Sequence, residues 1–232
     1  MTVDFGRNFT YIFDDPEWLS KLIIVVALTF ATAALMPFFL AGLVPLTILL
    51  GYMVDIVANV RDSKKNPLPV WQDYNGYLAK GVPVITAMIV YNLPLIAVSC
   101  CAWILPRTFT DEMAVSFFTL ANLCCIVPFV FVYTAVSWTL LAVGVVHYAR
   151  NGQGSAFYQV GVLSETAREM GTVTLRWILM GIGINILLSL IYAVPCIGWL
   201  AGAALSIPVH GYLVGQYARA IQRYRRKKAG AV

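Results

Sequence analysis

Long apolar runs separated by short polar segments form the pattern of this chain. An α-helix needs about 20 apolar residues to cross about 30 Å of hydrocarbon. The run over 19–60 is long enough for two crossings, and Pro37 marks a turn within it. The later runs extend the prediction to six membrane helices. We expect them at about 19–36, 39–60, 80–105, 122–148, 173–194 and 197–221.

The apolar run over 113–150 fits this scheme least well. As one helix it would reach about 57 Å, and as two crossings it would invert everything that follows. Charge decides between the alternatives, because six helices place all sixteen lysines and arginines except Arg107 on one side. The positive-inside rule makes that side, with both termini, cytoplasmic. We therefore expect one membrane helix at 122–148, preceded by an outer-surface stretch at 108–121.

Composition supports a membrane environment. The chain is 60% hydrophobic and 12% charged, with a mean hydropathy of +0.78, whereas soluble domains carry about 25% charged residues. No signal peptide is expected, because the N-terminus lacks a basic-then-apolar run with a cleavage site. The predicted fold class is all-α: a single integral membrane domain over 1–232, with six transmembrane helices arranged as three hairpins.

The polar stretch "NPLPVWQDYNGYLAKG" over 66–81 predicts a surface anchor. Pro69 can begin a short helix, and the aromatic residues that follow recur at helical spacing. We expect an amphipathic interfacial helix over 69–79, and similar interfacial segments at about 5–18, 108–121 and 155–170. The expected membrane-interface anchors are Trp18, Trp71, Tyr74 and Tyr77.

Similar segments recur along the chain. "LLGYMVDIVANVR", "LLAVGVVHYAR" and "VHGYLVGQYARAIQR" each end the second helix of a predicted hairpin with glycine, aliphatic or aromatic residues and arginine. This pattern is typical of an internal triplication, and also of any membrane helix that returns to a basic interface. The alternatives stay open.

These segments also carry a family resemblance. "FDDPEWLSKL", "GYMVDIVANVRDSKKNPLPVWQDYNGYLAKG", "HYARNGQGSAFYQVGVLSE" and "GYLVGQYARA" resemble a prokaryotic integral membrane family known only as domain of unknown function number four thousand and thirteen. The resemblance extends over nearly the whole chain and is most specific at 51–81. It implies a polytopic membrane protein and brings no activity or catalytic residues.

Small and polar residues inside the predicted helices suggest packing faces and one possible site. Two glycine pairs point to nearly opposite faces of the last helix, which predicts close packing on both sides. These glycines are Gly198, Gly202, Gly211 and Gly215. The candidate intramembrane polar site consists of Asp55, Asn92, Asn122 and Asn185. For Asp55 we favour a structural role, paired with Arg61 or His210, over a functional one.

The remaining candidates concern ligands. His147 and His210 are weak candidates for ligating haem or a chlorophyll magnesium, but hydrogen bonding to a neighbouring helix is the more usual role. No cofactor is predicted, and no metal site, because the cysteines and histidines do not stand at ligand spacing. The basic tail is expected to attract anionic lipid headgroups rather than nucleic acid. Its residues are Arg223, Arg225, Arg226, Lys227 and Lys228.

No catalytic motif stands in the sequence, so we predict a non-enzymatic protein. The leading hypothesis is an accessory or scaffold subunit of a complex in the prokaryotic cytoplasmic membrane. Its expected partners are the bilayer and other membrane subunits or further copies of itself. The alternatives are a small transporter or channel for lipid or ion and a cofactor- or pigment-binding subunit of an electron-transfer or light-harvesting complex.

Overall fold

The computed structural model describes residues 4–38, 40–104 and 111–230, and 87% of these described residues are helical. None of the described residues is in a strand. The N-terminal elements are α1 (Arg7–Thr10), η1 (Tyr11–Asp14), α2 (Trp18–Leu35), η2 (Met36–Phe38), α3 (Leu40–Arg61) and α4 (Tyr74–Ile104). The others are α5 (Glu112–Ala121), η4 (Asn122–Ile126), α6 (Val127–Asn151), η5 (Gly154–Tyr158), α7 (Val160–Glu169), α8 (Gly171–Tyr192) and α9 (Ile197–Ala229).

Six helical stretches within the described residues are long and apolar enough to cross a membrane. They correspond to α2, α3, α4, α5 continued through α6, α8 and α9. Helices suit this role because each satisfies its own backbone hydrogen bonds where no water is present. The described helices therefore indicate a polytopic all-α membrane protein.

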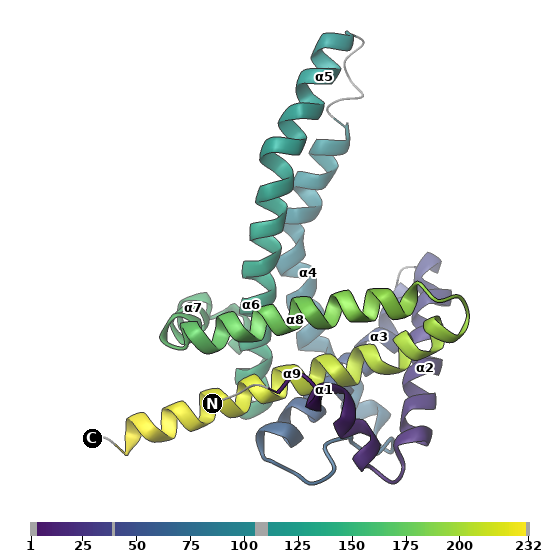
Figure 1. Ribbon diagram of the computed structural model, residues 1–232, viewed down its shortest axis with the longest axis vertical. Coiled ribbons are helices and arrows are strands. Elements are labelled where there is room, and N and C mark those ends of the chain that lie inside the picture. Colours follow the sequence, from purple (N-terminus) through teal and green to yellow (C-terminus); the bar gives the residue numbers. More distant parts are fainter. Residues whose placement is uncertain (1–3, 39, 105–110, 231–232) are drawn as a thin grey trace.

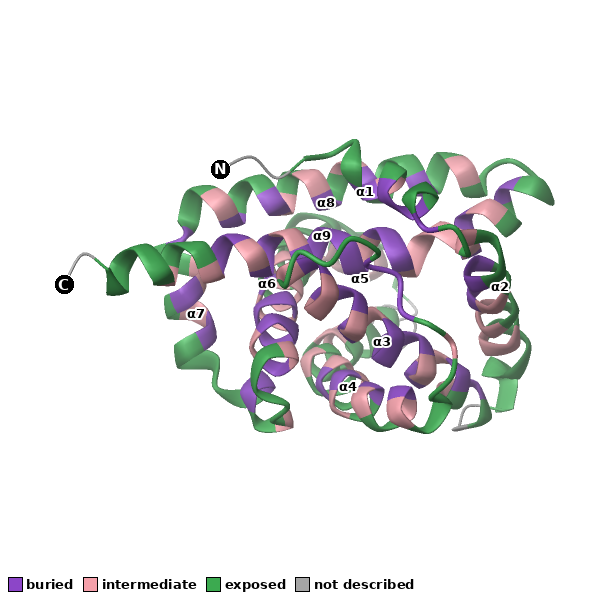
Figure 2. Ribbon diagram, turned by 90° about the horizontal axis from the view of Figure 1, so that it is seen from below, coloured by how far each residue is buried: buried purple, intermediate pink, exposed green. Residues whose placement is uncertain are grey.

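The helices do not form one parallel bundle. In Figure 1, α4 and the α5–α6 helix lie side by side and rise away from the rest, whereas α8 and α9 run across their lower part. The helix α9 contacts α1, α2, α3, α6 and α8. Figure 2 shows buried residues along α3, α6 and α9. The core therefore surrounds α9, and the far ends of α4 and α5 leave it.

For the segment 108–121 the sequence predicts an outer-surface stretch, and its described part forms a helix continuous with the next membrane helix. The helix α5 begins at Glu112 and continues through the π-helical turn η4 into α6. Residues 108–110 lie outside the described part. Extending a helix keeps every backbone hydrogen bond internal, so in an apolar environment it is favoured over an irregular surface stretch. Within η4, the Asn122 amide donates to the carbonyl of Ala102 on α4 (3.2 Å).

The structure defines the local conformation of the other predicted interfacial segments, and their position relative to lipid stays a prediction. No separate helix covers 69–79, because α4 begins at Tyr74 and the residues before it form a loop. The segment 5–18 contains α1 and η1, which pack on the protein: Tyr11 stacks on Tyr212 of α9 and donates a hydrogen bond to the carbonyl of Pro208 (2.9 Å). The segment 155–170 contains η5 and the short helix α7, whose residue Leu163 is buried.

Two glycines hold α3 and α4 close together. A Cβ on Gly51 of α3 would collide with the carbonyl oxygen of Tyr77 on α4. A Cβ on Gly81 of α4 would collide in turn with the carbonyl oxygen of Thr47 on α3. Because the obstructing atoms belong to helix backbones, a larger residue can be fitted only if the two helices separate. The α3–α4 contact therefore depends on these glycines.

Replacing Gly51 by alanine should lower the free energy of unfolding by about 2 kcal/mol, a typical cost of overpacking. Titration of the detergent-solubilised protein with dodecyl sulfate, followed by circular dichroism, measures this loss. Gly161→Ala is the matched control, because a Cβ at Gly161 of α7 meets no atom within 4 Å. Equal stability of both variants would contradict the proposed close contact.

Candidate functional site

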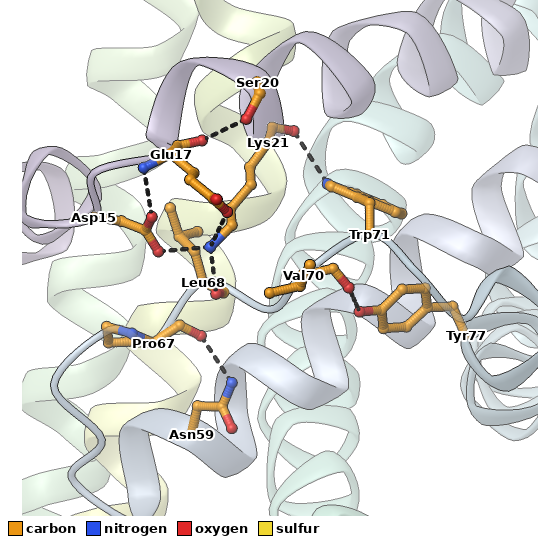
Figure 3. A network of polar contacts seen from close by, with 10 residues as sticks. All are labelled: Asp15, Glu17, Ser20, Lys21, Asn59, Pro67, Leu68, Val70, Trp71 and Tyr77. Atoms are coloured by element: carbon orange, nitrogen blue, oxygen red, sulfur yellow. Dashed lines mark hydrogen bonds and ion pairs between the residues drawn. The ribbon is translucent and has the colours of Figure 1, made fainter.

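A buried ion pair joins the N-terminal segment to α2. The Lys21 ammonium donates to the Asp15 carboxylate (2.7 Å) and to the carbonyl of Leu68 (3.2 Å). The Lys21 and Asp15 side chains are only 7% and 1% exposed. Figure 3 shows how the Lys21 side chain reaches between these two acceptors. The pair therefore ties three segments together, because a buried charge must remain near its partner.

The loop between α3 and α4 enters this network through Trp71. Its indole N–H donates to the backbone carbonyl of Lys21 (3.1 Å), and its ring stacks on Tyr52 of α3, with centroids 4.1 Å apart. The hydroxyl of Tyr77 donates to the carbonyl of Val70 (2.8 Å). The amide of Asn59 donates to the carbonyl of Pro67 (3.0 Å), so both ends of the loop are fixed (Figure 3).

The four predicted interface anchors have different environments. Tyr77 is buried, and Trp71 is partly buried within the aromatic cluster around Tyr52. Trp18 is partly buried and contacts the ring of Phe13 edge-on. Tyr74 is 44% exposed. The helical spacing of these aromatic residues therefore reflects packing against α2 and α3 at least as much as contact with lipid.

The candidate intramembrane polar residues do not form one site. The Asp55 carboxylate accepts two hydrogen bonds from the Lys80 ammonium, both 2.7 Å long, and this ion pair joins α3 to α4. The predicted partners, Arg61 and His210, make other contacts. The amides of Asn92 and Asn185 donate to carbonyls four residues earlier in their own helices. These positions satisfy polar groups locally.

The four predicted packing glycines lie against two different helices. A Cβ on Gly198 would meet the carbonyl of Ile191, and one on Gly202 would meet the ring of Tyr192, both on α8. Gly211 and Gly215 lie against Ile56 and Val60 of α3. The two faces of α9 thus contact two neighbours, which gives α9 its central place.

Arginines connect the C-terminal ends of three helices. Arg219 of α9 donates to the carbonyl of Val60 in the last turn of α3. Arg61 of α3 donates in turn to the carbonyl of Ala149 in the last turn of α6 (2.9 Å). The last carbonyls of a helix have no partner within it and carry partial negative charge, so guanidinium groups are favourable there.

Beside these contacts lies a cavity of about 450 Å³ between α3, α6 and α9. Its polar lining consists of Arg61, Asp62, His147, Arg150, Arg225 and Arg226, together with Gln222. Its apolar lining comes from Val146, Ala218, Ile221 and Ala229. A smaller cavity of about 280 Å³ adjoins it and adds Arg219 and Arg223. We call the larger cavity the arginine pocket.

One carboxylate, Asp62, lines the described part of the arginine pocket. It accepts two hydrogen bonds from Arg61, at 2.8 and 2.9 Å. These bonds hold the pKa of Asp62 below its ordinary value, so the carboxylate is ionised at neutral pH. Its negative charge therefore compensates the positive charge of Arg61. The charges of Arg150, Arg225 and Arg226, the other arginines of the pocket, have no carboxylate beside them among its described lining residues.

The two histidines have different roles. Arg225 donates to Nε2 of His147 (3.2 Å), and because arginine has no acceptor, this contact requires a neutral imidazole with its proton on Nδ1. His210 donates from Nδ1 to the carbonyl of Ser206 in its own helix (2.7 Å). The absence of a bound cofactor stays a prediction. Among the described residues, no group of three or more His, Cys, Asp or Glu side chains could hold a metal ion.

The structure brings together residues that the sequence separates. His147 is a predicted cofactor candidate, and Arg225 and Arg226 are predicted to attract lipid headgroups. All three line one pocket. Sequence reasoning missed Arg61 and Arg150 as site residues. The sequence did contain a signal for them, because Arg61 and Arg150 are the last residues of two of the three recurring segments. Arg219 occupies a similar place in the third segment.

Removing the buried carboxylate should destabilise the protein strongly. Asp15→Asn leaves Lys21 charged and buried, and should lower the free energy of unfolding by about 3 kcal/mol. Asp14→Asn is the matched control, because Asp14 pairs with Arg7 in an exposed ion pair and should cost less than about 1 kcal/mol. Dodecyl sulfate titration of both variants measures the difference. Equal losses would show that the Asp15–Lys21 pair does not stabilise the fold.

Comparison with known proteins assigns a family. A family model described as "Protein of unknown function (DUF4013)" matches residues 34–197, more than half of the chain. The match includes the stretch over 51–81 and ends before the basic part of α9. No curated protein and no solved structure matches the chain. The chain therefore belongs to the DUF4013 family of proteins of unknown function.

Proposed function

We propose that this protein is a non-enzymatic accessory or scaffold subunit of a complex in the prokaryotic cytoplasmic membrane. The observation that carries the proposal is the pair of long apolar helices, α4 and α5–α6, which leaves the core (Figure 1). We call the far part of this pair, Ala97–Ile104 with Glu112–Ile126, the arm. The arm has little cover from the rest of the protein.

Length distinguishes the helices that carry the arm from an ordinary membrane hairpin. With 31 residues, α4 is about 46 Å long at 1.5 Å per residue. Even at a common tilt of about 20°, that exceeds a hydrocarbon layer of about 30 Å. The excess must lie outside the lipid or be tilted far from the normal. Apolar side chains of the arm are nevertheless strongly exposed, such as Trp103 of α4 at 63% and Phe117 of α5 at 67%. Contact with another protein subunit would cover them.

Charge supports the orientation. Arg61, Arg150 and Arg225 meet at the arginine pocket. Lys21 lies in the first turn of α2, and Lys80 lies in the second turn of α4. Basic residues concentrate on the cytoplasmic side of inner-membrane proteins. We therefore place both termini in the cytoplasm and the far ends of α4 and α5 on the opposite side. The ion pair between Asp55 and Lys80 favours a structural role for Asp55 over a transport site.

Affinity purification from native membranes in mild detergent tests the subunit role. We expect a partner in fixed stoichiometry, either another membrane protein or a second copy of this chain. The double variant Phe117→Gln/Leu120→Gln should release that partner, because it places polar groups on the exposed arm. The matched control is Ile186→Gln/Leu190→Gln, which changes two similarly exposed residues of α8 and should retain the partner.

Two results would contradict the proposal. One is a lone, monodisperse monomer from membranes in which the native gene neighbours are expressed. The other is equal loss of the partner in both double variants, which would indicate a general effect of added polarity on assembly rather than contact at the arm.

A further inference from the structure

We propose that the arginine pocket binds a phosphate-bearing anion, with the phosphate held by Arg150, Arg225 and Arg226. The proposal does not depend on the subunit role, since it concerns the pocket alone. Its starting point is that three helices bring four arginines and a histidine to the wall of one cavity of about 450 Å³. Cavities of this size are typical of small-ligand sites.

The arginines of this region divide into two groups. Arg61 and Arg219 use their guanidinium groups on the carbonyls of α6 and α3, and Arg61 also binds Asp62. Their guanidinium donors are therefore satisfied within the protein, and Asp62 offsets the charge of Arg61. The side chains of Arg150 and Arg226 make no hydrogen bond or ion pair with any described residue, and the one hydrogen bond of the Arg225 side chain is with neutral His147. The second group is available to a ligand.

The chemistry of these side chains favours phosphate. A guanidinium presents parallel N–H donors that match two oxygens of a phosphate, whereas an ammonium acts as a point charge. The lysines of the basic tail do not line the pocket. Lys228 instead donates to the carboxylate of Glu169 on α7 (2.8 Å). The pocket is thus distinct from a diffuse polybasic tail, in which lysine and arginine would serve equally.

The apolar wall narrows the ligand class further. Val146 of α6 and Ala218 and Ile221 of α9 are buried hydrophobic residues that also line the pocket. A ligand that combines a phosphate with a non-polar part would meet both linings. An anionic phospholipid has this character and is present around the helices. A soluble phosphate monoester offers the same phosphate chemistry, and the test separates the two sources.

Native mass spectrometry of the detergent-solubilised full chain provides the measurement. Dioleoylphosphatidylglycerol is the lipid probe, and dioleoylglycerol is its counterpart without phosphate. We expect one phosphatidylglycerol molecule per chain at a tight site and no such site for dioleoylglycerol. Glycerol 3-phosphate and inorganic phosphate are added as soluble competitors of the lipid.

The decisive variant is Arg150→Gln/Arg226→Gln. Each lost charge-assisted contact should weaken binding about tenfold, so the double variant should bind phosphatidylglycerol about 100-fold more weakly. The matched control is Lys64→Gln/Lys65→Gln, which removes the same charge from exposed residues of the α3–α4 loop. Its affinity should change less than about threefold, because exposed charges attract lipid only weakly and without a fixed site. Unchanged thermal unfolding of all variants shows that they are folded.

The outcomes decide the proposal and the source of the phosphate. Selective loss in the Arg150→Gln/Arg226→Gln variant without competition by the soluble phosphates supports a lipid ligand. The same loss with displacement by glycerol 3-phosphate supports a soluble phosphate ligand. Equal loss in both double variants, unchanged binding in both, or equal binding of dioleoylglycerol would overturn the proposal.

Discussion

The rest of the structure depends on the burial of Lys21. A charged ammonium within a protein is tolerated only if acceptors surround it, and here they come from Asp15 in the N-terminal segment and Leu68 in the α3–α4 loop. Trp71 then binds the carbonyl of the same lysine and stacks on Tyr52. One charge thus fixes the start of α2, the loop and α3 in a single arrangement.

A second set of polar contacts extends this order to the other end of the core. Arg219 connects α9 to the end of α3, and Arg61 connects α3 to the end of α6. Between them, glycine contacts allow α9 to approach both α3 and α8 closely. The same arginine contacts that satisfy helix ends also bring Arg150, Arg225 and Arg226 around one cavity. Structural and candidate binding residues are therefore neighbours at this end of the molecule.

Much of the helical framework followed from the sequence, whereas the site did not. Apolar runs show where helices lie, because the length of hydrocarbon and the hydrogen-bonding needs of the backbone are local constraints. The sequence did not reveal which residues Trp71 and Tyr77 pack against. Their spacing fits an interfacial helix, but the residues pack on Tyr52, which stands far earlier in the chain. An amphipathic pattern does not reveal whether lipid or another helix covers its apolar side.

The sequence by itself determined the helical class and the six apolar stretches that are long enough to cross a membrane. These properties depend on composition and on short-range periodicity. Only the tertiary structure decided that Lys80 is the partner of Asp55, that α5 continues into α6, and that Arg61 and Arg150 share a pocket with Arg225. Each of these depends on how helices from distant parts of the chain pack together, and side-chain packing between segments leaves no periodic signal in a single sequence.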